Sequence, residues 1–523
     1  MPFSIFALAF AAVLGGCSPR SDAPKIAHSG LLRLAISSEP HSLNPIFSQS
    51  IPDNDIVRLM FDPLVAADPA GHLIPALAAE VPARENGGIS ADGLTITYRL
   101  RRDVRWHDGV PFTSADVAFS ARAVLDPHSN VQSRRGYDVI ASIATPDKYT
   151  VRFRLKQRFA PFVATVFSES DSPYYIIPQH VRNAAIEHSV FGTSPVGTGP
   201  FKFINWRRAD ALEFAANDDY FRGPPKLRRI TIRFDPDENT EITQLRAGEI
   251  DGVLNIGANA AALLKDVPGV HVVATPVNGY YGLMFNVRRF SDPRIRHAIA
   301  QAIDAAGFRA RIVHGYYGST VADLPSFLWA FDSALHPIAY DPAGARALLG
   351  AAGYSPQHRL KLDLAIIAAF RTHQSWAVQL QAELKPLGID VRIHPYLGQV
   401  FGAPAGENGI LSTGRYDAAI YGWTAGIDPD DSGQFMCDQR PPVGYNDAFY
   451  CNPQMDAAQR VALDRYDQPS RKRAYATIER LLLRDVPIVF VAGGAELTAL
   501  RDDMHGFSPN PVTMTAFAER WSW

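Results

Sequence analysis

The sequence predicts an α/β fold, and three observations support this. Helical and strand patterns alternate between residues 342 and 422, an order typical of a sheet covered by helices. Before this region, short segments with apolar residues at every second position predict half-buried strands. Glycine and proline number 38 and 39 among 523 residues, a share that suits many turns and short strands better than a helical bundle.

The composition bounds the class of protein. A chain of 523 residues corresponds to three or four domains at about 150 residues each. Apolar residues make up 47% and charged residues 20%, which excludes wholesale disorder. Lys and Arg number 51 and Asp and Glu 53, so the net charge is −2. This balance argues against a general nucleic-acid binder, which usually carries a basic excess.

The first 17 residues are typical of an export signal. Phe6 to Leu14 is an unbroken run of nine apolar residues, shorter than the roughly 18 needed to span a bilayer but suited to a signal-peptide core. Gly15-Gly16-Cys17 then resembles a bacterial lipobox, which predicts lipidation of Cys17, and residues 18–30 are expected to form a polar tether. No Lys or Arg precedes the apolar run, so a buried helix beside a fortuitous cysteine stays an alternative.

The body of the chain carries the remaining elements in order. Thr113, with Asp116 three residues later, predicts a capping box at the start of one helix. Strands are expected at 31–36, 95–100, 150–155, 201–206, 211–214, 229–234, around 253, 271–274, 280–286, 361–367, 389–394, 417–422, 488–491 and 496–500. Helices are expected at 113–125, 239–247, 293–304, 342–351, 374–384, 453–463 and 469–484.

Three cysteines exclude a dense disulfide scaffold. Cys437 and Cys451 are separated by thirteen residues that include two prolines and a glycine, a loop that a disulfide can close. Two buried free thiols are the alternative, and a metal site is less favoured because no third ligand is evident.

Motifs of the common catalytic sites are absent from the sequence. There is no Gly-x-Ser-x-Gly elbow and no His-Glu-x-x-His helix. Residues 195–200 (PVGTGP) lack the Lys and Ser or Thr of a phosphate loop. Residues 235–239 begin like a calcium loop, but its sixth and twelfth positions are Thr240 and Arg246. The chain is therefore not expected to be an enzyme, although a triad dispersed in sequence stays open, and no cofactor or metal ion is expected.

Several short segments, in a fixed order over nearly 500 residues, resemble a known family. The chain is similar to the family 5 extracellular solute-binding proteins of ABC importers, the dipeptide- and oligopeptide-binding group, from about Leu31 to the C-terminus. The matching segments are 42–45 (SLNP), 106–117 (WHDGVPFTSADV), 197–201 (GTGPF), 217–220 (NDDY), and 285–286 (FN) with 292–298 (DPRIRHA).

This resemblance implies a two-lobed periplasmic-binding-protein-like fold of type II, cluster C, with an extra subdomain. Lobe I is expected at residues 31–275 plus 492–523, with the subdomain at about 51–194. Lobe II is expected at 276–491. The chain would thus cross between the lobes twice.

The resemblance also implies a transport function. A ligand would bind between the two lobes as they close, and the loaded protein would deliver it to an ABC permease with its ATPase subunits. The protein would be an exported monomer, anchored by lipid at the periplasmic or other extracytoplasmic face of a membrane. The expected ligand is peptide-like or another small polar organic molecule, with an opine, a sugar or a metal chelate as the alternative. An exported hydrolase and a sensor that does not transport are the rivals.

One departure from the family concerns the ligand's amino group. In peptide-binding relatives, an aspartate three residues after the Trp of a Gly-Trp pair holds this group, and here Gly422-Trp423 is followed at that distance by Gly426. Asp428 is the candidate replacement, with a turn aspartate before Pro429 as the alternative.

Five further residues are candidates for contact with the ligand. Trp423 is expected to stack on it from the end of a strand, or to pack in the lobe core. Of Tyr280 and Tyr281, which point in opposite directions, one should face the cleft. Arg371 is placed where some relatives bind the ligand's carboxylate, with a solvated loop arginine as the alternative. Asn44 is expected to line the cleft from lobe I.

Overall fold

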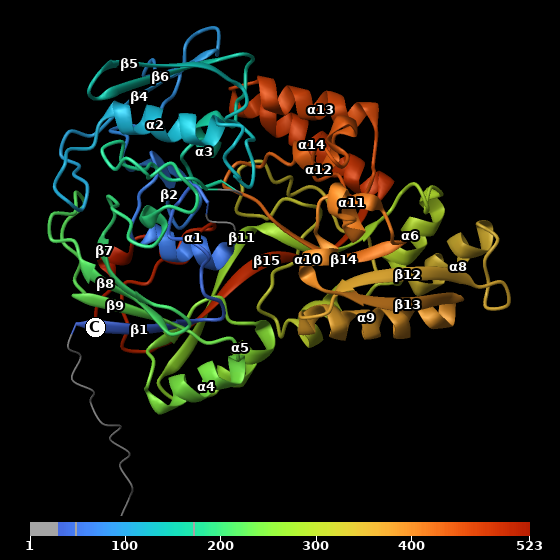
Figure 1. Ribbon diagram of the computed structural model, residues 1–523. Helices are drawn as coiled ribbons and strands as arrows, with labels where there is room; N and C mark the ends of the chain where they lie inside the picture. The colour runs from blue at the N-terminus through green and yellow to red at the C-terminus, as the bar shows by residue number, and fades with distance from the viewer. Residues whose placement is uncertain (1–29, 48–49, 171–172) are drawn as a thin grey trace, which may run out of the picture.

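The computed structural model describes residues 30–47, 50–170 and 173–523 (Figure 1). The N-terminal apolar run, Cys17 and nearly all of the expected tether lie outside the described residues. None of the helices in the described ranges combines the length and the apolar character that crossing a bilayer requires.

Within these ranges, one mixed sheet of ten strands extends through two lobes (Figure 1). In spatial order the strands are β13 (Ile389–Tyr396), β12 (Leu360–Ile367), β14 (Ala418–Thr424), β11 (Val270–Phe285), β15 (Ile488–Arg501), β10 (Gly252–Val253), β1 (Leu31–Ile36), β9 (Arg229–Phe234), β8 (Ala211–Ala216) and β7 (Phe201–Arg207). Lobe I contains the end of the sheet from β10 to β7, and lobe II contains the end from β13 to β14.

Two long antiparallel strands connect the lobes. β11 pairs with β15 from Val270 opposite Arg501 to Met284 opposite Ile488, with register shifts between Pro276 and Tyr280 and after Tyr281. The sequence predicted two separate strands in place of each, and this was wrong. The bulges break the period-two pattern, so one strand is interrupted in sequence although it is continuous in space.

Helices cover both faces of the sheet in lobe II. Leu283 and Phe285 pack in one apolar cluster with α6 (Pro293–Ala302), α8 (Pro342–Ala351) and α9 (Arg371–Leu384). The neighbouring Met284 packs in another cluster, with α13 (Pro453–Asp464) and α14 (Gln468–Asp485). Adjacent strand residues thus point to opposite layers.

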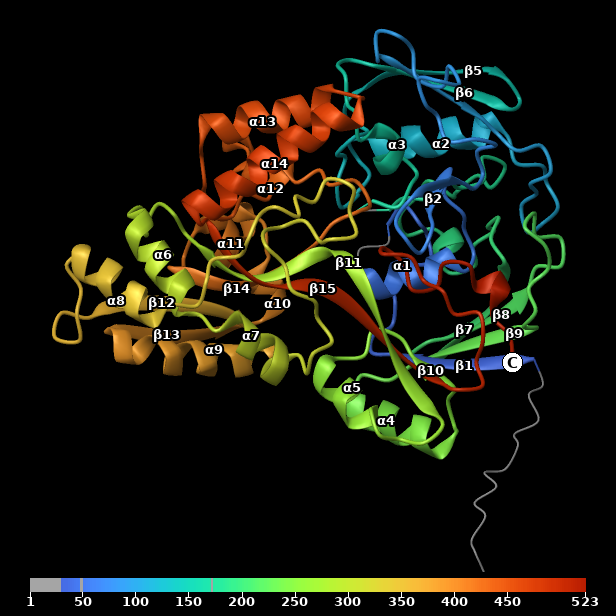
Figure 2. The ribbon, with the colours of Figure 1, turned by 180° about the vertical axis from the view of Figure 1, so that it is seen from behind.

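In lobe I a second, smaller sheet lies apart from the main one (Figure 2). It is formed by β4 (Thr95–Arg99), β6 (Thr150–Leu155) and β5 (Ile140–Asp147), and α2 (Ser114–Leu125) packs against it. The predicted capping box of α2 is present, because Thr113 N donates to Asp116 Oδ2 at 2.8 Å. The sequence did not predict β5, because most of its side chains are exposed and show no alternation.

The remaining helices and strands are short. Near the lobe boundary, α4 (Glu238–Ala247) and α5 (Ala258–Leu264) follow β9 and β10. The others are α1 (Ile51–Arg58), β2 (Val65–Ala67), β3 (Leu73–Pro75), α3 (Phe162–Thr165), α7 (Ala305–Gly307), α10 (Gly398–Phe401), α11 (Ile410–Thr413) and α12 (Ser432–Phe435).

Candidate functional site

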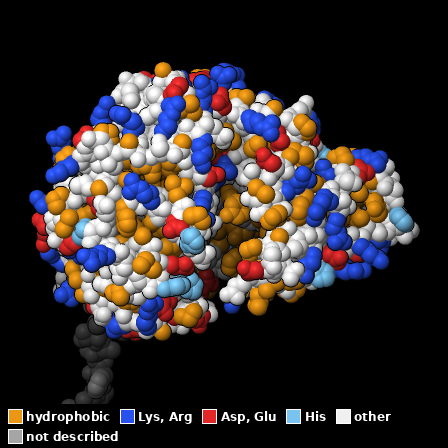
Figure 3. Space-filling view, turned by 45° about the horizontal axis from the view of Figure 1, so that its top comes forward, with side chains coloured by type: hydrophobic (Ala, Val, Ile, Leu, Met, Phe, Trp, Pro, Cys, Tyr) orange, Lys and Arg blue, Asp and Glu red, His pale blue; other side chains and the backbone are white. Residues whose placement is uncertain are grey.

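A cavity of about 730 Å³ lies between the two lobes, beside the crossing strands. Figure 3 shows the molecule hollowed between the lobes, with hydrophobic side chains in the hollow. Lobe I contributes the end of β1, the start of α4 and the segment from β10 to α5, whereas lobe II contributes β14 and the start of α9. A volume of this size is typical of sites for small-molecule ligands.

Aromatic rings from lobe II form part of the wall. Trp423, at the end of β14, lines the cavity and stacks on Tyr421 with ring centroids 6.4 Å apart and planes 15° apart. The Tyr445 ring also packs against Trp423, with ring centroids 5.5 Å apart. Trp423 is partly exposed, so its ring combines a fixed position with a face toward the cavity.

The two neighbouring tyrosines on β11, Tyr280 and Tyr281, lie in different surroundings. Tyr280 is 2% exposed and its hydroxyl donates to Gln434 Oε1 at 2.6 Å, so it belongs mainly to the core of lobe II although it borders the cavity. Tyr281 is less buried and packs against Tyr317, with centroids 5.5 Å apart. Both Tyr281 and Tyr317 line the cavity.

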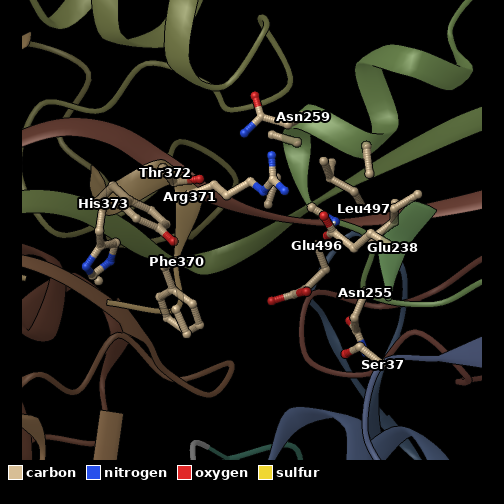
Figure 4. A pocket seen from close by; sticks show the side chains of 18 of the residues that line it. Ser37, Glu238, Asn255, Asn259, Phe370, Arg371, Thr372, His373, Glu496 and Leu497 are labelled. Atoms are coloured by element: carbon tan, nitrogen blue, oxygen red, sulfur yellow. Dashed lines mark hydrogen bonds between the residues drawn. The ribbon is translucent and has the colours of Figure 1, made fainter. Parts of the chain in front are cut away.

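Arg371 is the first residue of α9, which begins three residues earlier than the sequence predicted. Its side chain extends into the cavity from lobe II, toward the wall that carries Asn259, Glu238 and Glu496 (Figure 4). The preceding Phe370 provides no side-chain cap. The first-turn amides of α9 and the guanidinium therefore create positive potential at this end.

His373, in the same turn, adds no charge at neutral pH. It is buried, and burial lowers the pKa of its imidazole to about 4. Its Nδ1 accepts a hydrogen bond from Ile367 N at 3.2 Å, as a neutral ring nitrogen does.

Two predicted site residues, Asp428 and Asn44, do not line this cavity. Both carboxylate oxygens of Asp428 accept hydrogen bonds from Arg471, at 2.6 and 2.9 Å, and Asp428 borders a separate void of about 30 Å³. Asn44 is fully buried in lobe I, where its Nδ2 donates to Ala184 O at 2.9 Å and its Oδ1 accepts from Ile46 N. Sequence position alone could not reveal these partners.

Gly426 has a structural explanation. Its carbonyl accepts from Asn278 Nδ2 at 2.6 Å, and the next amide, Ile427 N, donates to Glu169 O of lobe I at 2.9 Å. A Cβ at position 426 would lie 2.4 Å from Ser170 Cα and 2.7 Å from Glu169 O. The close approach of the two backbones leaves no room for an aspartate here.

Sequence reasoning missed the polar residues of the opposite wall. Glu496 on β15 and Asn255 between β10 and α5 both line the cavity. Burial, with a contribution from the Asp55 carboxyl, raises the pKa of Glu496 to about 8. One signal was available, since Glu496 is the only charged residue between Ile488 and Leu500. A carboxylate inside an apolar strand pattern indicates a function or a buried partner.

One further prediction concerns the cysteines. Cys437 and Cys451 are joined by a disulfide, with Cα atoms 4.5 Å apart, as the sequence indicated. No group of three or more His, Cys, Asp or Glu side chains in the described ranges is arranged to hold a metal ion.

Comparisons with known proteins agree with this architecture. The chain is 28% identical to Di/tripeptide-binding protein 2 of Pseudomonas aeruginosa over 488 aligned residues. This alignment covers 88% of this chain and 88% of the relative. NikZ of Campylobacter jejuni, solved in complex with Ni(L-His), matches with a TM-score of 0.79 and 25% identity, covering 94% of this chain and 99% of that one. DppA of Helicobacter pylori, solved in complex with the peptide STSA, matches with a TM-score of 0.78 and 25% identity, covering 94% and 98%.

The family assignment follows from a match that spans more than half of the chain. The model of the bacterial extracellular solute-binding proteins, family 5 Middle, matches residues 72–441. The matched range includes β11, β14 and the start of α9, which form much of the cavity wall. This chain belongs to the family 5 extracellular solute-binding proteins of ABC transporters.

Proposed function

We propose that this protein captures a peptide in the cavity between its lobes and delivers it unchanged to an ABC permease. The observation that carries the proposal is a free strand edge in the cavity wall. Among the described residues, β12 pairs with β14 only at Ala418 and Ala419, whereas Gly422, Trp423 and Thr424 line the cavity further along. An extended peptide can add to such an edge through main-chain hydrogen bonds.

The side chains around this edge suit the same ligand. Main-chain pairing is independent of sequence, and the rings of Trp423 and Tyr281 offer apolar contact to side chains of different kinds. The name of the Pseudomonas aeruginosa relative and the peptide bound to the Helicobacter pylori protein point to the same class.

In this proposal closure of the lobes completes the site. Lobe I comprises residues 31–275 and 492–523, with the subdomain at about 51–194, and lobe II comprises 276–491. β11 and β15 are the only strands paired across this boundary in the described part of the chain, so bending there would move the lobes as units. A peptide that contacts both lobes favours the closed state.

The test is a ligand screen on purified protein, denatured and refolded to remove co-purified molecules. A random tripeptide library should raise the melting temperature, since a ligand stabilises by RT ln(1 + [L]/Kd), and mass spectrometry should recover the peptides intact. Stabilisation by sugars, opines or metal chelates but by no peptide would refute the peptide assignment. Cleaved peptides would refute the absence of catalysis.

We further propose that lipid on Cys17 holds the protein, as a monomer, at the extracytoplasmic face of a membrane. Glycines at positions 15 and 16 before this cysteine support it. Cys17→Ser should move the protein from the membrane fraction to the soluble fraction. Unchanged membrane association of this variant would contradict lipid anchoring at Cys17.

A further inference from the structure

The wall opposite Arg371 carries a carboxylate that no donor satisfies. Glu496 lies on β15 and lines the cavity, and its side chain is only partly exposed (Figure 4). In residues 30–47, 50–170 and 173–523, its carboxylate has neither a hydrogen-bond donor nor an ion-pair partner. Since Glu496 lines the cavity and no protein donor in these ranges reaches its carboxylate, a cation in the cavity would form a charge-assisted hydrogen bond with it.

A second unsatisfied acceptor lines the same wall. Asn255 Nδ2 donates to Asp55 Oδ2 at 2.9 Å, which identifies the remaining amide atom as an oxygen. This Oδ1 is buried and, among the described residues, receives no hydrogen bond. Asn255 also has a φ of 56°, in the left-handed region. Asparagine tolerates this conformation better than most residues, and such conformations are often found at ligand sites.

Both acceptors belong to residues that line the same wall of the cavity. A carboxylate and an amide oxygen are both satisfied by a group that carries several N–H donors and a positive charge, such as an ammonium. The neighbouring Glu238 differs, because its Oε1 already accepts from Gly257 N at 2.9 Å. Glu238 lines the same wall, but the acceptors without a hydrogen-bond donor in the described part of the chain are those of Glu496 and Asn255.

The opposite end of the cavity has the complementary charge. Arg371 and the uncapped first turn of α9 present N–H donors and positive potential. The Arg371 guanidinium has no ion-pair or hydrogen-bond partner among the described residues. The cavity thus has an acceptor end on lobe I and a donor end on lobe II.

We propose that Glu496 and Asn255 form a subsite for a cationic ammonium or guanidinium group of the ligand, and so fix the direction in which it lies. The ligand's carboxylate then faces Arg371. This inference rests on the proposed function, because it assumes a peptide in the cavity. It assigns the cation to the crossing strand β15, not to the loop after Trp423, where Gly426 leaves no space for a carboxylate.

The test compares capture of four tripeptide libraries by the refolded full-length protein, measured by mass spectrometry. The first library has uncharged side chains and free termini, the second is the same library N-acetylated, the third is N-acetylated with one lysine, and the fourth is amidated at the C-terminus. A charge-assisted hydrogen bond corresponds to roughly a 10- to 100-fold difference in affinity. The wild-type protein should prefer the first library over the second by about that factor.

Three variants show which side chains cause the preference for a free amine and for a free carboxylate. Glu496→Gln should capture the first two libraries within about threefold of each other, whereas Glu238→Gln, the matched control on the same wall, should keep the wild-type preference. Arg371→Gln should lose the preference for the free carboxylate over the amide and retain that for the free amine.

The third library identifies which cation of the ligand binds. Capture of this library would assign the cation to a side chain, and its exclusion would assign it to the α-amino group. Either result supports a cation subsite.

Failure of the inference is distinct from failure of the proposed function. If the wild-type protein captures peptides and Glu496→Gln retains the full preference for a free amine, the subsite is wrong and peptide binding stands. An equal loss in Glu238→Gln would also refute it, because the charge would then act through the whole wall. Capture of no library by the wild-type protein would overturn both.

Discussion

Trp423 combines a supported ring with an accessible face. Tyr421 and Tyr445 both pack against it, and part of the side chain is exposed to the cavity. A ring fixed in this way loses little conformational entropy when a ligand packs on it, so its contribution to binding should exceed its contribution to folding.

Trp423→Ala should therefore weaken peptide capture and leave the melting temperature nearly unchanged. The loss of an aromatic contact of about 0.5–1.5 kcal/mol corresponds to roughly a 2- to 13-fold lower affinity. Titration calorimetry with a peptide recovered from the screen measures it. Tyr340→Ala removes a ring that is 55% exposed and outside the cavity, and serves as control. Equal affinities of Trp423→Ala and the wild-type protein would remove Trp423 from the site.

Gly426 permits the contact between the lobes. Gly426→Asp introduces the aspartate that the family resemblance led us to expect at this position, but it places the new Cβ against the backbone of Ser170 and Glu169. We expect a lower melting temperature and no gain in peptide affinity, because the backbones must separate. Gly406→Asp is the control, since a Cβ at position 406 meets nothing within 4 Å. Tighter binding by Gly426→Asp would contradict this account.

At the scale of the element, α14 contains a buried glutamate, Glu479, that lies near other acidic side chains. Glu479 is fully buried and its Oε2 accepts from Asp332 N at 3.1 Å. Burial, with the negative charges of Asp332 and Asp431, raises the pKa of Glu479 from 4.5 to about 8. Between these two values the folded protein retains a proton that the unfolded chain has lost. This contribution to stability is complete below pH 4.5 and is lost as the pH rises through about 8.

Glu479→Gln should consequently flatten the alkaline decline in stability. Glutamine does not titrate, so the variant should lose less unfolding free energy than the wild-type protein between pH 6 and pH 9. Urea unfolding at several pH values checks this, with the exposed Glu407→Gln as control. Parallel pH profiles for the wild-type protein and Glu479→Gln would show that another group is responsible.

The disulfide stabilises a segment that contains little regular structure. Cys437 and Cys451 lie 14 positions apart in a region of turns before α13. In the chain-entropy model, closing a loop of this length contributes about 3 kcal/mol. Replacement of both cysteines by serine should lower the unfolding free energy by about 2–4 kcal/mol. Dithiothreitol should lower the stability of the wild-type protein similarly and leave the double variant unchanged; an unaffected wild-type protein would argue against the bridge.

At the scale of the whole molecule, contacts near the small sheet join the two lobes. Arg135 Nε donates to Asp430 Oδ2 at 3.2 Å, and Ala160 N donates to Leu463 O at 2.7 Å. Tyr466 Oη donates to Gly93 O at 2.8 Å. These contacts lie away from the crossing strands, so opening of the lobes about β11 and β15 would break them.

Arg135→Ala should therefore favour the open state and weaken peptide capture by about two- to fivefold, the range of a modest ion pair. Small-angle scattering should show contraction when the tripeptide library binds the wild-type protein and a larger radius of gyration for the unliganded variant. Arg158 forms an ion pair with Asp464 at 3.4 Å in which both side chains are exposed. Arg158→Ala should therefore match the wild-type protein in peptide capture and in radius of gyration. Identical scattering of all three proteins would exclude this role for Arg135.

The sequence by itself determined the α/β class, the capping box of α2, the disulfide and the family. These follow from periodicity, spacing and ordered motifs, which are local properties of a chain. Trp423 and Arg371 could also be placed near the cavity, because they lie at the end of a strand and at the start of a helix whose order the family shares, and Tyr281 because it lies on the crossing segment.

Only the tertiary structure decided the rest. Asp428 pairs with Arg471, 43 positions away, and Asn44 bonds to Ala184, 140 positions away. Glu496 and Asn255 meet at one wall because β15 returns from lobe II and pairs with β10. Whether a polar side chain meets a partner or a ligand depends on which distant segment folds beside it, and no local pattern in the sequence contains that information.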